Sequence, residues 1–215
     1  MGDIGKFMSD GGPFMWVIVG VWAIGLAIMI ERFKFLLAAG SINKDEVLGH
    51  VNSYILQGNV EKAVAITSQV RSPLTNIVRA GLVAIVNSGD PEEVQTAMDA
   101  VALREIPRIE KRIGLLATLS NIATLLGLLG TVTGLIGAFA ATANAAPAEK
   151  AALLANSIAT AMNTTALGLI AAIPLLAGFG YLNSKAQDLI DDIHESAVST
   201  LNFIMTNRNK IQVRK

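Results

Sequence analysis

Two long stretches of this chain contain no charged residue at all. Residues 113–148 and residues 151–184 lack Asp, Glu, Lys and Arg, and a third such stretch covers residues 11–30. Each stretch reaches or exceeds the roughly 20 apolar residues that a helix needs to cross a lipid bilayer. A disordered chain, a nucleic-acid-binding domain and a soluble enzyme with one large core fit this pattern poorly. The sequence predicts an all-α integral membrane protein embedded in a lipid bilayer.

The composition narrows the function further. Apolar residues make up 52% of the chain and charged residues 16%, with a formal net charge of zero that gives no argument for a nucleic-acid partner. The absence of cysteine excludes disulfides and thiolate metal sites. His50 and His194 stand alone, and no nucleophile–base pair or metal-ligand spacing occurs. We therefore expect that the chain is not an enzyme and that it binds neither a metal ion nor a cofactor.

The charge-free stretches define three membrane spans and the segments between them. We expect a periplasmic N-terminus (1–12), a first span (13–37), a cytoplasmic helical segment (38–112), a second span (113–143), a periplasmic loop (144–150), a third span (151–182) and a cytoplasmic helical tail (183–215). The residues before the first span include Asp3, Lys6 and Asp10 rather than the basic region that a signal peptide has. We therefore expect the first span to be retained as a membrane anchor. The alternative is a signal peptide that is cleaved at the small residues 38–41, which resemble a cleavage site.

Positive residues set the orientation of the spans. Only Lys6 and Lys150 fall on one side, while the other fifteen of the 17 Lys and Arg residues fall on the opposite side. The side rich in Lys and Arg faces the cytoplasm. The N-terminus is therefore expected outside and the C-terminus in the cytoplasm.

The segments outside the spans carry helix signals. Asp90 followed by Pro91 is a typical helix start, and Asn59 is a weaker one. Helices formed by residues 113–148 and 151–184 would be longer than the hydrocarbon core is thick, so we expect these helices to continue into a cytoplasmic bundle. The tail is expected to continue as a helix, because apolar residues recur at helical spacing and acidic residues would then point outward. The apolar residues are Leu189, Ile193, Ala197 and Leu201, and the acidic residues are Asp188, Asp191, Asp192 and Glu195.

The second span carries a glycine face. Its glycines are spaced 3, 4 and 3 residues apart: Gly127, Gly130, Gly134 and Gly137. In lipid, small residues at this spacing let two helix backbones approach closely, so helix packing is the expected role. A phosphate-binding loop is excluded because no strand precedes the glycines and no Gly-Lys-Ser or Gly-Lys-Thr sequence follows them.

Hydroxyl and amide side chains accompany the glycines. Thr124 and Thr131 lie a heptad apart in the second span, and the third span carries Ser157, Thr160, Thr164 and Gly168 on one face together with Asn156 and Asn163. An asparagine in hydrocarbon needs a hydrogen-bonding partner or water. Neither long span contains Asp, Glu, Lys, Arg or His. Because proton relays need an ionisable group in the membrane, this chain either moves no protons or relies on a carboxylate from another subunit.

Two sequence motifs carry a resemblance to a known family. Residues 126–136 (LGLLGTVTGLI) resemble the second-span motif of the ExbB/TolQ/MotA proton-channel family. Residues 165–174 (TALGLIAAIP), followed by Tyr-Leu-Asn at 181–183, resemble its third-span motif. Chain length, three spans and the large cytoplasmic segment agree with the ExbB and TolQ branch rather than with the four-span flagellar branch.

The resemblance implies a pentamer around two transmembrane helices of an ExbD/TolR-like one-span partner, whose membrane Asp carries the proton. Thr131 and Thr165 match the family threonines that face this Asp, and Thr160 and Asn163 are further candidates for the proton pathway. Family members often carry glutamate where this chain has Thr160. The sequence around Asn163 resembles that of TonB-associated and gliding-motility members. Helix-packing roles are expected for Gly127, Gly130, Gly134, Gly137, Gly168 and Pro174.

The function that the resemblance implies is that of a motor subunit in the inner membrane of a bacterial cell, driven by the proton motive force. Its client would be a TonB-type uptake system, a TolA-type envelope system or a gliding system. Two other classes stay open from the residues alone: a structural scaffold held together by the glycine face, and a subunit of a transporter. A scaffold needs no proton dependence, and a transporter usually has internal repeats, which this sequence does not show.

Overall fold

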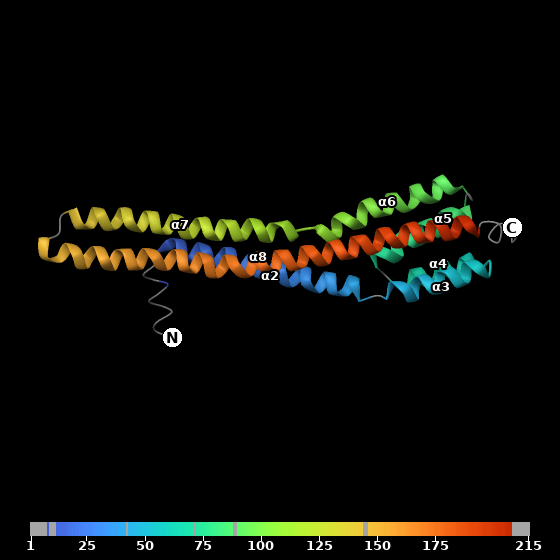
Figure 1. Cartoon of the computed structure of the whole chain (residues 1–215), viewed down its shortest axis with the longest axis horizontal. Coiled ribbons are helices and arrows are strands. Elements are labelled where there is room, and N and C mark those ends of the chain that lie inside the picture. Colours follow the sequence, from blue (N-terminus) through green and yellow to red (C-terminus); the bar gives the residue numbers. More distant parts are fainter. Residues whose placement is uncertain are drawn as a thin grey trace. The chain divides into compact units, whose positions relative to one another are not determined.

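The computed structural model describes residue 8 and residues 12–41, 43–70, 72–87, 90–143 and 146–207. The regular elements within these ranges are all helices: α2 (Pro13–Gly40), α3 (Lys44–Leu56), α4 (Val60–Gln69), α5 (Pro73–Asn87), α6 (Pro91–Glu110), α7 (Ile113–Ala143) and α8 (Pro147–Thr206) (Figure 1). The predicted all-α fold is confirmed. Asp3, Lys6, Asp10 and Asn144, on which part of the predicted topology rests, lie outside the described residues.

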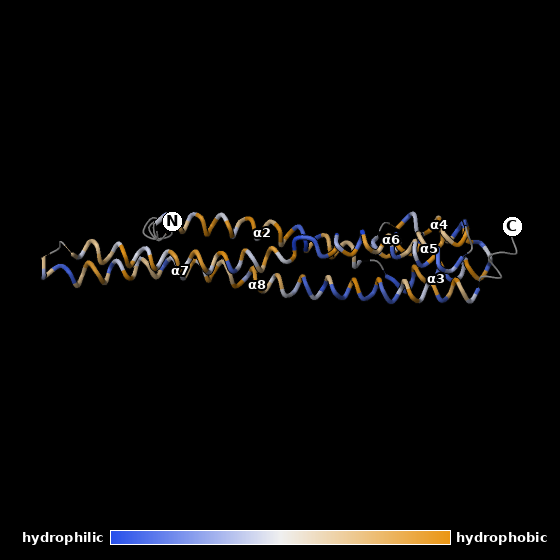
Figure 2. Tube along the Cα trace, turned by 90° about the horizontal axis from the view of Figure 1, so that it is seen from above, coloured by the Kyte–Doolittle hydropathy of each residue, from blue (hydrophilic) through white to orange (hydrophobic). Residues whose placement is uncertain are grey.

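Three of these helices are long and apolar enough to cross a membrane. Figure 2 shows hydrophobic residues dominating α2, α7 and the first half of α8. Helix α7 has the bounds of the predicted second span. Helix α8 begins at Pro147, four residues before the predicted third span, because proline is well suited to the first turn of a helix.

The chain forms two compact units. The membrane unit comprises Met1–Arg32 and Arg112–Leu182, and the bundle unit comprises Phe33–Lys111 and Asn183–Lys215. Helices α2 and α8 each contribute residues to both units. The membrane unit contains the glycines, the hydroxyl side chains and both family-like motifs.

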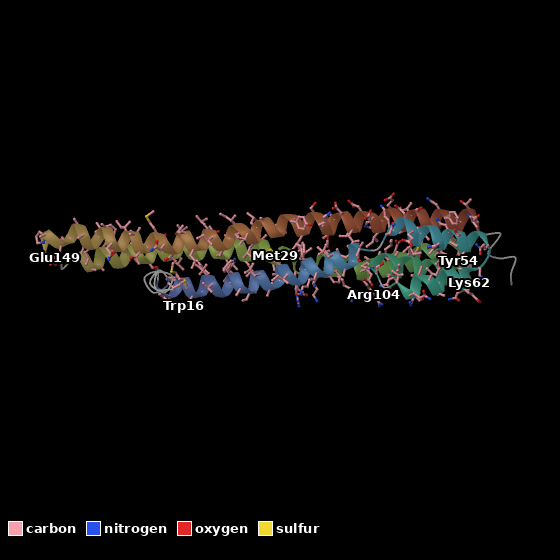
Figure 3. All side chains as sticks on the ribbon, turned by 90° about the horizontal axis from the view of Figure 1, so that it is seen from below. Trp16, Met29, Tyr54, Lys62, Arg104 and Glu149 are labelled. Carbon is pink, nitrogen blue, oxygen red and sulfur yellow. The ribbon has the colours of Figure 1, made fainter. Side chains whose placement is uncertain are left out.

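In the membrane unit, α2 packs against the pair formed by α7 and α8. The buried residues Ile18, Ala123, Ala171 and Ala172 form the contact, with Val21, Trp22, Leu126 and Leu167 packed around them. Further along α2, Met29 points toward α8 and meets Gly178 (Figure 3). Trp16 is exposed, as suits an interfacial tryptophan, but the indole nitrogen of Trp22 is buried against α7 and α8.

The bundle unit is built from short capped helices. Asp90 caps α6 by accepting from the Glu92 backbone N–H, and Asn59 caps α4 by accepting from Lys62, so both predicted helix starts are confirmed. Helices α5 and α6 pack closely where Met98 and Val94 cover Gly81. The tail of α8 buries Ala186, Ile190, Ile193 and Ile204; of the predicted apolar repeat, only Ile193 is fully buried.

Candidate functional site

The contact between α7 and α8 is made by small residues at alternating spacings of three and four. On α7 these are Ser120, Ala123, Gly127, Gly130 and Gly134; on α8 they are Ala161, Thr164, Gly168 and Ala171. A methyl group added at Gly168 would stand 2.8 Å from the Ala123 carbonyl oxygen and 3.1 Å from the Gly127 Cα. The two backbones are therefore in direct contact, which only small residues permit in lipid.

Gly127, Gly130, Gly134 and Gly168 all lie in this contact: an added methyl group would collide with the facing helix at the last three and would be tightly placed at Gly127, 3.1 Å from the Thr165 Cα. Gly137 has no neighbouring atom within 4 Å of such a methyl group, and Pro174 is exposed. Within one chain these two residues therefore lie outside the α7–α8 contact. A packing role for them stays a prediction that would need a second chain.

Two hydroxyl groups join α7 and α8 across this contact. The Thr165 hydroxyl donates to the Gly127 carbonyl oxygen at 2.9 Å, and the Ser120 hydroxyl donates to the Ala172 carbonyl oxygen at 2.8 Å. The two bonds are seven residues apart on each helix and run in opposite directions between the helices. Ser120 was not among the predicted site residues, although it lies seven residues before Gly127 on the same helix face.

Thr131 lies one turn beyond Gly127 on α7. Its side chain is half-buried, and its hydroxyl donates to the Leu128 carbonyl oxygen at 2.6 Å. On a helix, Thr131 is rotated by about 140° from Leu126, and Thr165 on α8 by about 160° from Leu167. Leu126 and Leu167 pack toward α2. Thr131 and Thr165 therefore share the flank of the α7–α8 pair that faces away from α2, which we call the hydroxyl flank.

The other two predicted site residues lie elsewhere. Thr160 lines a groove of about 470 Å³ that also includes Thr133, Asn156 and Pro13 at the start of α2. By helix geometry Thr160 and Asn163 are rotated from Thr165 by about 140° and 160°. The structure therefore groups Thr131 with Thr165 but places Thr160 and Asn163 on the other side of α8.

The hydroxyl flank can exchange hydrogen bonds but cannot itself release a proton. A threonine hydroxyl has one donor and two acceptor lone pairs, so a hydroxyl bonded to a backbone carbonyl can still accept from a protonated carboxyl group. By rotating away from the carbonyl it can instead donate to a carboxylate. No Asp, Glu, Lys, Arg or His occurs in α7 or in residues 151–182 of α8. Among the described residues, no cluster of His, Asp or Glu has the arrangement of a metal site.

Comparison with known proteins matches this architecture. The family model described as the MotA/TolQ/ExbB proton channel family matches residues 69–195. A protein of Methanothermobacter thermautotrophicus, described as a biopolymer transport protein ExbB homologue, is 28% identical over 193 residues, which are 89% of this chain and 67% of that protein. The solved structure of C. jejuni MotAB is similar, with a TM-score of 0.60, 17% identity, and coverage of 94% of this chain and 85% of that chain.

At 17% identity the likeness to MotAB shows the fold alone. The family model, in contrast, covers more than half of the chain and includes both motifs and the complete α7–α8 contact. The chain belongs to the MotA/TolQ/ExbB proton channel family.

Proposed function

We propose that this chain is the ring-forming subunit of a motor driven by the proton motive force. Five copies, the number that the family resemblance implies, enclose the transmembrane helices of an ExbD/TolR-like one-span partner. The partner contributes the membrane Asp that binds and releases the proton. The N-terminus faces the periplasm and the C-terminus the cytoplasm, as the distribution of Lys and Arg indicates.

The observation that carries this proposal is the combination of a hydroxyl flank with two long spans that lack Asp, Glu, Lys, Arg and His. Thr131 and Thr165 have their hydroxyls on the same side of the α7–α8 pair, and neither α7 nor residues 151–182 of α8 contain a carboxylate or histidine. A proton that crosses the membrane here needs an ionisable group from elsewhere. A partner carboxylate at the hydroxyl flank supplies that group.

The two threonines have a defined task in this mechanism. A charged carboxylate in the membrane is costly unless donors surround it, and the hydroxyls of Thr131 and Thr165 are donors at that position. Protonation removes the charge and with it the hold on these hydroxyls, so that the ring can rotate past the partner helices. One elementary charge that moves through 100 mV supplies about 2.3 kcal/mol for this step. The work passes to a periplasmic client of the TonB, TolA or gliding type.

The proposal predicts that Thr131→Val and Thr165→Val each abolish motor output in cells while the complex still assembles. Valine keeps the shape of threonine but removes the hydroxyl. Thr165→Val also removes the bond to Gly127, and one interhelical hydrogen bond in a membrane is worth about 0.6 kcal/mol. Motor output is measured as client activity, and assembly as the yield of purified oligomer.

Ser120→Ala is the matched control, because it removes the other interhelical bond while the hydroxyls of Thr131 and Thr165 stay in place. Thr133→Val is a second control, since the Thr133 hydroxyl bonds only within α7, to Leu129 and Gly130, and lines the groove at the start of α2. Both controls should keep most of the activity. If Thr131→Val and Thr165→Val behave like the controls, the hydroxyls are structural and the chain is better described as a scaffold.

A further inference from the structure

The bundle unit contains a groove of about 660 Å³ along the contact of α5 with α6. One end is lined by Arg79, Arg104 and Arg108, which we call the arginine end. The other end is lined by small and apolar residues, among them Val83 and Ala97. The groove therefore suits a helix or extended segment that offers acidic side chains at one end.

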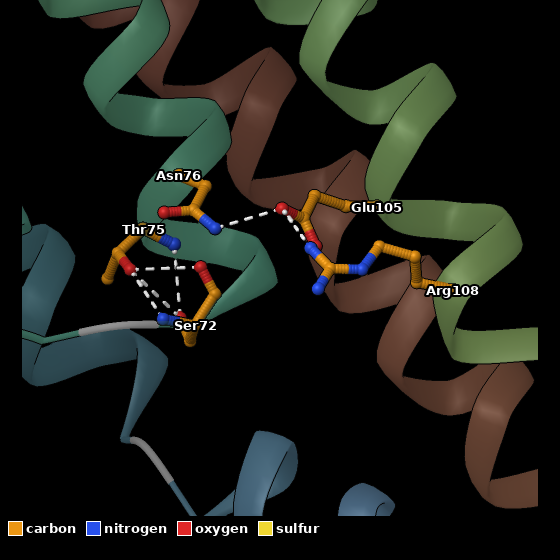
Figure 4. Close-up of polar contacts among 5 residues, drawn as sticks. All are labelled: Ser72, Thr75, Asn76, Glu105 and Arg108. Atoms are coloured by element: carbon orange, nitrogen blue, oxygen red, sulfur yellow. Dashed lines mark hydrogen bonds and ion pairs between the residues drawn. The ribbon is translucent and has the colours of Figure 1, made fainter.

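A buried carboxylate holds the arginine end in place. Glu105 is 8% exposed, accepts from the Asn76 side-chain amide at 2.9 Å and pairs with the Arg108 guanidinium at 3.4 Å (Figure 4). Arg104 lies at the surface of the same helix (Figure 3). With three arginines and one glutamate, this end keeps a net charge of +2.

The tail of α8 carries the complementary charge. Asp188, Asp191, Asp192 and Glu195 lie on one face of the helix, which we call the acidic face, while Ala186, Ile190 and Ile193 are buried on the opposite face. Lys44 pairs with Asp192 and Glu195, and Lys185 pairs with Asp188. Four carboxylates and two lysines leave this face with a net charge of −2.

The acidic face and the arginine end lie at the same height in the bundle unit. The Gln187 amide donates to the Glu110 carboxylate at 3.3 Å, and α6 and α8 run in opposite directions (Figure 1). With a rise of about 1.5 Å per residue, Asp188 to Glu195 therefore extend over the same level as Arg108 and Arg104. A rotation about an axis parallel to α8 keeps this level, so the acidic face of one copy and the arginine end of another copy in a ring are at matching heights.

We propose that the acidic face of one copy binds the arginine end of the groove on the adjacent copy. This interaction rests on the ring assembly of the proposed function. It would be a specific contact between adjacent copies in the cytoplasmic part of the ring. A lipid headgroup is the other anionic group that the arginine end could bind, and the test below distinguishes it from a second copy of the chain.

The test is charge reversal and charge exchange in the full-length chain, in nanodiscs at low salt. The arginine variant is Arg79→Glu with Arg104→Glu, which leaves Arg108 and its contact to Glu105 intact. The acidic variant is Asp188→Arg with Asp191→Arg. Each should lower the fraction of complete rings by more than about tenfold, because like charges then face each other across the contact. Native mass spectrometry measures this fraction.

A chain that carries both pairs of substitutions has the two charges exchanged, which restores the attraction. Its ring fraction should therefore return to within about twofold of the wild type. Glu46→Arg with Asp99→Arg is the control for the acidic variant, since it makes the same change in net charge on exposed positions outside both surfaces. High salt should weaken the wild-type ring and reduce the difference between wild type and variants, because it screens exposed charges.

Each other outcome overturns the inference. Rings that resist both reversals would contradict it and leave the proposed function standing, since proton flux is measured separately. The charge reversals could instead lower the ring fraction only in nanodiscs that contain phosphatidylglycerol, without recovery when both reversals are combined. This result would identify a lipid headgroup as the occupant. A wild-type chain that forms no ring would contradict both this contact and the proposed function.

Discussion

At Gly168 the backbone of α8 lies against the backbone of α7. The Ala123 carbonyl oxygen and the Gly127 Cα occupy the space into which any larger side chain would extend. Both are backbone atoms, so neither can move aside without shifting a whole helix. The glycine is therefore required by the close approach that brings the Thr165 hydroxyl within reach of Gly127.

Gly168→Ala should destabilise the protein by roughly 1–3 kcal/mol, the usual range for an overpacked contact. Gly137→Ala makes the same chemical change where an added methyl group meets no atom within 4 Å. There the higher helix propensity of alanine should leave stability unchanged or raise it by up to about 1 kcal/mol. Thermal unfolding in detergent compares the two variants, and an equal effect of both would contradict the close contact at Gly168.

Between α6 and α7 the chain adopts an unusual backbone conformation. Arg112 has a φ angle of +66°, the left-handed region that non-glycine residues seldom occupy. Its guanidinium pairs with Glu31 of α2 at 2.9 Å. The turn separates α6 from α7, where a continuous helix would otherwise run from Pro91 to Ala143.

Arg112→Gly and Arg112→Ala form a matched pair of variants, because both lose the ion pair to Glu31. Only glycine adopts the left-handed conformation without a steric cost. Arg112→Gly should therefore be more stable than Arg112→Ala by about 1 kcal/mol, the reverse of their order inside a helix. Thermal unfolding in detergent measures the difference. An alanine variant as stable as the glycine variant would show that the left-handed turn is not retained.

Much of the helix pattern could be predicted from the sequence, because its signals are local. Long charge-free stretches predict the spans, Asp90 followed by Pro91 predicts the start of α6, and the charges up to Arg112 predict where α7 begins. The turn at Arg112 could not be predicted, since the nearest residues that disfavour a helix, Pro107 and Gly114, both lie inside helices and Arg112 itself is no turn-forming residue. The charge pattern locates the boundary but not the backbone that forms it.

The candidate site was only partly predictable for a different reason. The glycine spacing predicts close packing, but which hydroxyl bonds to which carbonyl depends on the register between two helices, which no local pattern encodes. Ser120 was therefore missed as a partner of Ala172, and the separation of Thr160 from Thr165 was not expected. The grouping of Thr131 with Thr165 also becomes visible only when the position of α2 is known.

At the scale of the whole molecule, one chain leaves much apolar surface uncovered. Leu125 and Ile136 on α7 and Met162 and Ile173 on α8 are each more than 60% exposed. In the bilayer, lipid can cover such residues, but Asn156 and Asn163 on α8 require hydrogen-bonding partners or water. Assembly with further chains provides such partners, as the ring model requires.

Native mass spectrometry of the detergent-extracted wild-type chain should therefore show a closed oligomer, with five copies as the expected number. The physical reason is that a three-span protomer cannot bury its polar stripe and its exposed helix faces alone. The mass directly gives the number of copies. A monodisperse monomer under gentle extraction would contradict ring assembly, and a closed ring of a different number would correct only the stoichiometry.

The central claim is a division of labour, in which this chain supplies hydroxyl groups and the partner supplies the titrating carboxylate. Proton flux into sealed vesicles under an imposed membrane potential tests it most directly. Vesicles that contain this chain alone should take up protons no faster than empty vesicles. Vesicles that contain the chain together with its one-span partner should conduct, and an Asp→Asn change in the partner's membrane segment should stop the flux. Strong flux from this chain alone would contradict the account, because neither of its two long spans (113–143 and 151–182) contains Asp, Glu, Lys, Arg or His.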